Sequence, residues 1–143
     1  MRDISVVINA RLQSSRVPGK LIRPFADSTL IQIALLKLDQ LHYFSHRFLA
    51  CAEEELIRLA SDHAHIEILR RDKKAVQKGV NPLEVTLRHY LDVPTEWIFV
   101  LNPCQPLLSL GSLEKAFDLF HSPALILFTC RRPFMKVFAR MFL

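Results

Sequence analysis

Short apolar runs alternate along this chain with longer stretches in which apolar positions recur at helical spacing. The runs are four or five residues long and predict buried strands, since a strand covered on both faces is apolar throughout; they lie at residues 4–8, 48–52, 66–69 and 97–101, with a further candidate at 124–128. The helical stretches keep one apolar face and lie at residues 29–42, 53–60, 83–91 and 113–121. The alternation predicts an α/β fold, a three-layer sandwich around a central, mostly parallel sheet.

The loops that follow the predicted strands are the first place to look for a binding site. In parallel sheets, ligands bind beyond the carboxyl ends of the strands. Residues 9–20, 70–78 and 102–106 fall at that edge, and the first two of these loops are basic. We therefore expect a positively charged cleft that suits an anion.

Two segments of different character divide the chain. Residues 1–130 carry the strand and helix pattern and are predicted to form one domain, whereas residues 131–143 form a basic, apolar tail. As a helix, the tail would place Phe134, Val137, Phe138 and Met141 on one face. We expect such a face to cover apolar surface or to form a dimer contact, and binding to a membrane surface is the alternative.

Composition narrows the class of protein. The chain has 143 residues, of which 50% are hydrophobic and 23% charged, as expected for one folded domain. We expect no membrane span, because no apolar run approaches the ~20 residues that a spanning helix needs. The three cysteines, Cys51, Cys104 and Cys130, are odd in number and far apart. They predict reduced thiols in a cytoplasmic protein.

The net charge of +5 indicates an anionic partner. A nucleic-acid-binding module is one interpretation. Against it, the sequence shows no helix-turn-helix, zinc or RNA-binding aromatic signature, and its basic groups cluster at predicted strand ends. We therefore expect a compact phosphate ligand and no nucleic acid.

The loop after the first predicted strand carries the strongest chemical signal. Arg11, Arg16 and Lys20 supply three cations within ten residues, and Ser14 and Ser15 add two hydroxyls. A triphosphate needs this combination of fixed positive charge and hydrogen-bond donors. Neither the Walker phosphate loop nor the G-x-G-x-x-G dinucleotide motif is present. A solvated basic loop is the alternative interpretation.

The opening of the chain resembles the cytidylyltransferases that activate acidic sugars, namely the CMP-sialic acid and CMP-ketodeoxyoctonate synthetases and their spore-coat polysaccharide relatives. Their first strand leads into an A-R-x-x-S-x-R-x-P-x-K loop, which this sequence matches at Ala10, Arg11, Ser14, Arg16, Pro18 and Lys20. The resemblance covers about residues 4–130 and implies a Rossmann-like, nucleotide-diphospho-sugar-transferase-like fold. Members of that family are substantially longer, so this chain resembles a truncated one.

The resemblance also implies a reaction, in which a sugar hydroxyl attacks the α-phosphate of CTP and pyrophosphate leaves. Arg11 and Lys20 would act in catalysis by offsetting phosphate charge. The implied nucleotide-binding residues are Ala10, Arg11, Ser14, Ser15, Arg16, Lys20 and Arg71, with Arg71 near the cytosine ring. Asn102 and Gln105 would bind ribose or sugar. The implied partners are CTP, an acidic sugar and a second copy of the chain in a homodimer.

Mg²⁺ is the cofactor that the resemblance implies, but the sequence identifies no ligand for it. Cys104 stands where the ketodeoxyoctonate branch has a metal-binding Asp, and a thiol does not suit a hard cation. His63 and His65 would share one face of a strand, yet no third ligand is near, and we expect surface residues. A non-catalytic nucleotide-binding fragment therefore stays open as an alternative function.

Overall fold

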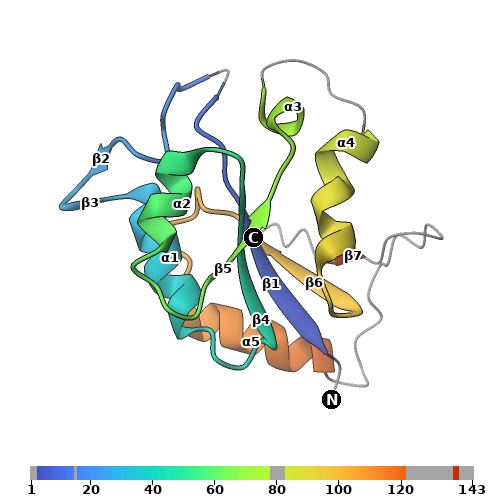
Figure 1. Ribbon diagram of the computed structural model, residues 1–143. Coiled ribbons are helices and arrows are strands. Elements are labelled where there is room, and N and C mark those ends of the chain that lie inside the picture. The colour runs from blue at the N-terminus through green and yellow to red at the C-terminus, as the bar shows by residue number, and fades with distance from the viewer. Residues whose placement is uncertain (1–2, 15, 78–82, 122–136, 139–143) are drawn as a thin grey trace.

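The computed structural model describes residues 3–14, 16–77, 83–121 and 137–138. Its main sheet has five strands in the order β5-β4-β1-β6-β7, and every strand pair described in it is parallel (Figure 1). The strands are β1 (Ile4–Asn9), β4 (His46–Cys51), β5 (Glu67–Arg70), β6 (Trp97–Leu101) and β7 (Val137–Phe138). The predicted α/β fold with a central parallel sheet is confirmed.

Helices connect the strands much as the apolar spacing predicts. They are α1 (Leu30–Gln40), α2 (Glu54–Ala60), α3 (Lys73–Val76), α4 (Leu83–Leu87), the 3-10 helix η1 (Arg88–Asp92) and α5 (Leu110–His121). The helix predicted over 83–91 is thus an α-helical turn that tightens into a 3-10 helix, a common ending for a helix. Within the described ranges, no helix has both the length and the hydropathy that crossing a bilayer requires.

A small hairpin interrupts the loop between β1 and α1, and the sequence pattern does not predict it. Its strands, β2 (Pro24–Phe25) and β3 (Ser28–Thr29), pair antiparallel. Thr29 then caps α1, because its side chain accepts a hydrogen bond from the backbone N–H of Gln32 at 3.2 Å. The hairpin therefore ends the basic loop and sets where α1 begins.

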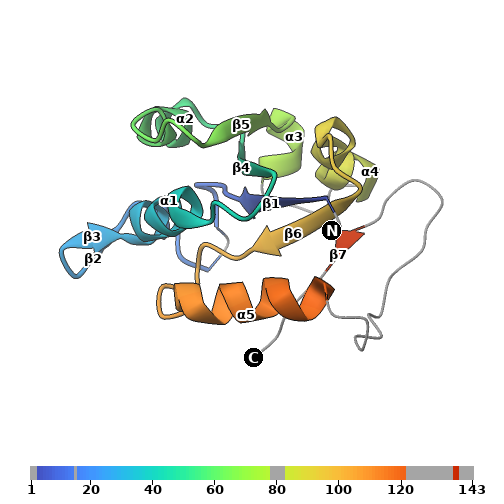
Figure 2. The same ribbon diagram turned by 90° about the horizontal axis from the view of Figure 1, so that it is seen from below.

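The sheet separates two apolar cores, because successive side chains of a strand point to opposite faces. Val6 and Ile8 of β1 are fully buried on one face, in a core shared with α1, α2 and α5. Val7 is buried on the other face, against Tyr90 and Val93. Figure 2 shows α5 and α4 on opposite sides of the sheet. These are the three layers of the predicted sandwich.

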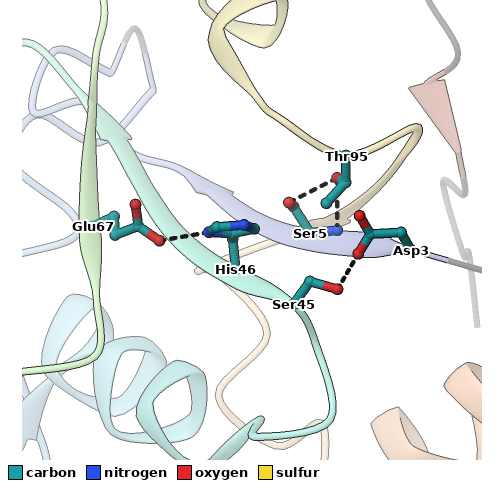
Figure 3. Close-up of polar contacts among 6 residues, drawn as sticks. All are labelled: Asp3, Ser5, Ser45, His46, Glu67 and Thr95. Carbon is teal, nitrogen blue, oxygen red and sulfur yellow. Dashed lines mark hydrogen bonds and ion pairs between the residues drawn. The ribbon is translucent and has the colours of Figure 1, made fainter.

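Side-chain hydrogen bonds join neighbouring segments at the amino-terminal edge of the sheet (Figure 3). The buried Ser5 donates its backbone N–H to Thr95 Oγ1 at 3.0 Å, and the two hydroxyl oxygens lie 2.7 Å apart. Two further pairs at this edge are Asp3 with Ser45, and His46 with Glu67. These contacts fix the edge opposite the loops where the sequence predicts the site.

The carboxyl-terminal tail departs from the helical expectation at two residues. Val137 and Phe138 form β7 and pair in parallel with Ile98 and Phe99 of β6. The helix prediction is wrong there, because Val and Phe favour strands and the edge of β6 offers unpaired backbone groups. The rest of the tail and the strand predicted at 124–128 lie outside the described residues.

The two histidines expected to be surface residues are half-buried (His63) and exposed (His65). The strand begins at Glu67, so His63 and His65 precede it in a turn and share no strand face. His63 Nδ1 lies 3.6 Å from Asp39 Oδ2, and the His65 ring meets His42 edge-on. Their contacts join the turn to the end of α1 and to the segment that follows it.

Candidate functional site

The carboxyl ends of four strands meet at one edge of the sheet. In the strand register, Asn9 of β1 lies opposite Ala50 of β4, and Ile8 lies opposite Leu101 of β6. Arg70, the last residue of β5, lies opposite Cys51. The loops after β1 and β5 both extend from this edge (Figure 1). The predicted meeting of the loops at 9–20, 70–78 and 102–106 is therefore confirmed at their starting points.

Backbone hydrogen bonds give the loop after β1 a compact shape. Ala10 donates its N–H to Ala50 O at 2.9 Å, and Gly19 donates to Leu12 O at 3.0 Å. The φ angle of +64° at Gly19 is in the left-handed region that glycine adopts without strain. Ser14 is buried, and its hydroxyl accepts a hydrogen bond from the N–H of Val17 at 3.4 Å. Ser14 thus holds the turn from inside.

The cations of this loop stand at its surface. Arg11 and Arg16 are exposed, and Lys20 is half-buried. Ala10 is fully buried at the base of the loop. Ser15, the remaining nucleotide-binding residue predicted here, lies outside the described residues. The loop therefore presents positive charge to solvent on a frame held by backbone contacts.

Arg71 lies beside this loop, although it follows a different strand. Its backbone N–H binds Cys51 O at 2.9 Å, and its Nη2 donates to Ala75 O at 3.5 Å. Its Nε is buried without a hydrogen-bond partner. Burial lowers the pKa of Arg71, and the nearby positive charge of Arg11 lowers it further, against the opposing effect of Tyr90. The structure thus brings two guanidinium groups together and leaves one buried donor for an acceptor.

A buried polar cluster adjoins Arg71, and sequence reasoning did not find it. Asn9 donates from Nδ2 to the Tyr90 hydroxyl oxygen. The Asn9 Oδ1 accepts from His89 Nε2 at 2.8 Å. Burial lowers the pKa of His89 to about 4, helped by the positive charge of Arg71, so the ring is neutral at pH 7. Burial also raises the pKa of the Tyr90 hydroxyl. The cluster joins η1 to the carboxyl end of β1.

Glu53 is the second group that the sequence did not assign to the site. It lies just before α2, where an acidic side chain is expected to stabilise the positive end of the helix dipole. Instead, its Oε1 accepts the N–H of Leu12 at 2.8 Å, and its Oε2 accepts the N–H of Ala52 at 3.2 Å. A carboxylate from the end of β4 therefore holds the basic loop 41 residues earlier in the chain.

The two predicted sugar-binding residues occupy a separate part of this edge. Asn102 and Gln105 are exposed in the loop after β6, and Asn102 Oδ1 accepts the N–H of Cys104 at 3.0 Å. Lys37 of α1 donates to the carbonyl oxygen of Gln105 at 3.3 Å. A shallow pocket lies between α1 and this loop. Among the contacts of the described residues, none joins Asn102 or Gln105 to Arg11 or Arg71.

The described residues offer no ready metal site. No group of three His, Cys, Asp or Glu side chains is close enough there to hold a metal ion. Cys104, at the position where a metal-binding Asp is expected by resemblance, is half-buried. Glu53, whose carboxylate is hydrogen-bonded to the loop, already accepts two backbone N–H groups.

The parallel sheet with helices on both faces is a Rossmann-like α/β fold, and the cationic loop lies at the carboxyl edge of that sheet, where ligands bind in such folds. The cytidylyltransferase family model matches residues 5–121, and the chain belongs to that family. A search of curated proteins finds no match.

Several solved structures share the fold of this chain. A cytidylyltransferase from Leptospira borgpetersenii is 22% identical, with a TM-score of 0.66, over 84% of this chain and 49% of that one. The CMP:2-keto-3-deoxy-manno-octonic acid synthetase solved with CTP is 17% identical, with a TM-score of 0.63, over 86% and 49%. A Mycobacterium tuberculosis protein solved with manganese is 17% identical, with a TM-score of 0.53, over 82% and 59%. The chain thus spans about half the length of the first two.

Proposed function

We propose that this chain binds CTP at the carboxyl edge of its sheet, as part of an enzyme that transfers the cytidylyl group to an acidic sugar. The observation that carries the proposal is the pairing of the cationic loop with Arg71. The loop matches the family's triphosphate motif, and the buried Nε of Arg71 has no acceptor of its own. CTP brings both an anion for the loop and the carbonyl oxygen of cytosine for the arginine.

Each residue of the loop then has a distinct task. Arg11, Arg16 and Lys20 neutralise the triphosphate, and Arg11 and Lys20 also offset the charge that develops when pyrophosphate leaves. Ser14 keeps the turn in shape through Val17 and donates its own hydroxyl hydrogen to phosphate. Ser15 is proposed as a second hydroxyl donor, and the buried Ala10 lets the backbone approach the ligand.

The sugar is proposed to enter from the side of the loop after β6. Asn102 and Gln105 are exposed there, with amide groups suited to ribose or sugar hydroxyls. A hydroxyl of the sugar attacks the α-phosphate of CTP and releases its proton to solvent, the new phosphoester bond forms, and pyrophosphate departs with the electron pair of the broken bond. We propose a ulosonic acid such as sialic acid as the substrate class, for polysaccharide biosynthesis.

Mg²⁺ would accompany CTP by resemblance, and the M. tuberculosis neighbour was solved with manganese. Among the described residues no group of three His, Cys, Asp or Glu side chains gathers, and Mg²⁺ on a nucleotide is held mainly by phosphate oxygens, waters and one or two carboxylates. No residue here is therefore assigned to the metal.

The proposal also includes a cellular location and an oligomeric state. CTP chemistry and the free thiols of Cys51 and Cys104 suit a cytoplasmic location. A homodimer is expected by resemblance, and size-exclusion chromatography with light scattering tests it.

Titration calorimetry with CTP, UTP and inorganic tripolyphosphate tests the binding step. The wild-type chain should prefer CTP over UTP, and Arg71→Lys should lose that preference while keeping affinity for tripolyphosphate, since it retains the charge but not the planar donor group. A pyrophosphate-release assay with sialic acid and ketodeoxyoctonate then tests turnover. Absence of CTP binding at millimolar concentration would refute the nucleotide site.

A further inference from the structure

The carboxylate of Glu53 connects two loops of the candidate site through backbone hydrogen bonds. Its Oε1 lies 2.8 Å from Leu12 N in the basic loop, and its Oε2 lies 3.2 Å from Ala52 N at the end of β4. Both oxygens of one ionisable group are thus used, and one bond spans 41 residues of sequence. Hydrogen bonds from backbone N–H groups to a carboxylate are stronger than those between neutral groups.

The local role expected of this residue is not the one it performs. Glu53 is the N-cap residue of α2, a position whose side chain ordinarily accepts an N–H from the first turn of its own helix. No such side-chain bond is made there. The carboxylate instead accepts the N–H of Leu12, so capping of α2 does not explain where the side chain lies.

We propose that Glu53 is a positioning residue that holds the basic loop in the shape that receives a triphosphate, an inference that rests on the proposed CTP site. Leu12 follows Arg11 directly, and its carbonyl accepts the N–H of Gly19 at 3.0 Å, which closes the turn of the loop. Holding the Leu12 N–H therefore fixes the backbone from which Arg11 projects. A loop ordered before the ligand arrives loses less conformational entropy on binding.

The same carboxylate also moderates repulsion within the site. Arg11 and Arg71 are close enough for the charge of one to disfavour the charge of the other, and Glu53 favours the charged state of Arg71. The negative charge of Glu53 also opposes a triphosphate, so its removal has two effects of opposite sign. Replacement by Gln separates them, since the amide oxygen can still accept from Leu12 while the charge is lost.

Amide hydrogen exchange tests the brace without any nucleotide. In Glu53→Ala, exchange at the Leu12 amide should quicken about tenfold, the effect of losing one hydrogen bond to a charged group. Exchange at the Arg71 amide, which binds Cys51 O, should stay the same and so report that the sheet is intact. The matched control is Glu55→Ala, at an exposed acid two positions along. Unchanged exchange at Leu12 in Glu53→Ala would overturn the proposal.

Binding of CTP and of cytidine tests whether the brace serves the triphosphate. Glu53→Ala should weaken CTP binding about tenfold and leave cytidine binding unchanged, whereas Glu53→Gln should stay within about threefold of wild type for CTP. A general loss of folding would weaken both ligands alike. CTP binding that is as tight in Glu53→Ala as in wild type refutes the positioning role. A wild-type chain that binds no CTP refutes the proposed function, while the exchange result still decides whether Glu53 holds the loop.

Discussion

Acidification should destabilise this fold through one buried imidazole, that of His89. The residue is 5% exposed, and its Nε2 donates to Asn9 Oδ1 at 2.8 Å. Burial, together with the charge of Arg71, lowers the pKa of His89 to about 4, against about 6.5 for a histidine in an unfolded chain. Between these two values the unfolded chain binds a proton that the folded chain does not.

The sign and size of the effect follow from this difference in pKa. The stability that the neutral ring contributes is fully present above about pH 6.5 and is lost as the pH falls through about 4. The whole difference corresponds to about 3 kcal/mol in the free energy of unfolding, of which about 2 kcal/mol is already lost at about pH 5.

Urea unfolding at about pH 7.5 and about pH 5 measures this loss in wild type and in His89→Gln. The Gln amide can donate to Asn9 but does not titrate, so the stability difference between the two proteins should change by about 2 kcal/mol over this range. His65→Gln, at an exposed histidine, corrects for the loss of an imidazole elsewhere. A stability difference that is equal at both pH values would refute the argument, because it would mean that His89 titrates alike in the folded and unfolded chains.

Four further substitutions test separate parts of the structure. Arg11→Ala and Lys20→Ala should each weaken CTP binding by roughly 1.5–3 kcal/mol, as measured by calorimetry, because each removes a charged hydrogen bond to phosphate; unchanged dissociation constants in both would contradict the site. Gly19→Ala should lower stability by about 1–2 kcal/mol in thermal unfolding, since φ is +64° there while the added Cβ would meet only Ile22 at 3.8 Å. Thr95→Val should cost about 1–3 kcal/mol in urea unfolding, because it leaves the buried N–H of Ser5 without its acceptor; an unaffected midpoint would count against that contact.

The strands and most helices of this chain are predictable because their signals are local. The runs of β1 and β6 are apolar from end to end, which marks strands covered on both faces. The hairpin of β2 and β3 and the short strand β7 are exceptions. Among the described residues, β7 pairs through Val137 and Phe138, and the sequence pattern around these two residues fits a helix equally well. What decides their conformation is the free edge of β6, some 40 residues earlier.

Some residues of the site can be predicted from local sequence, whereas others are recognised only by partners that lie far away in the sequence. The cationic loop is visible as a motif, and parallel topology places Arg71 at the same edge. Glu53, His89 and Tyr90 are not visible, because each looks like an ordinary member of a helix and meets its partner only after folding. Their bonds to the loop and to Asn9 span 41, 80 and 81 residues, respectively, which no short pattern records.

The central place of β1 in the sheet bears on the order in which the molecule takes shape as it is synthesised. β1 leaves the ribosome before both of its partners, which are residues 46–50 and residues 97–101. Its apolar side chains are therefore covered on both sides only after residue 101 has been synthesised. Pairing between residues far apart in sequence slows folding, and until it is complete the apolar segment of β1 stays exposed and prone to aggregation. The nascent chain should thus need chaperone protection until β6 has emerged.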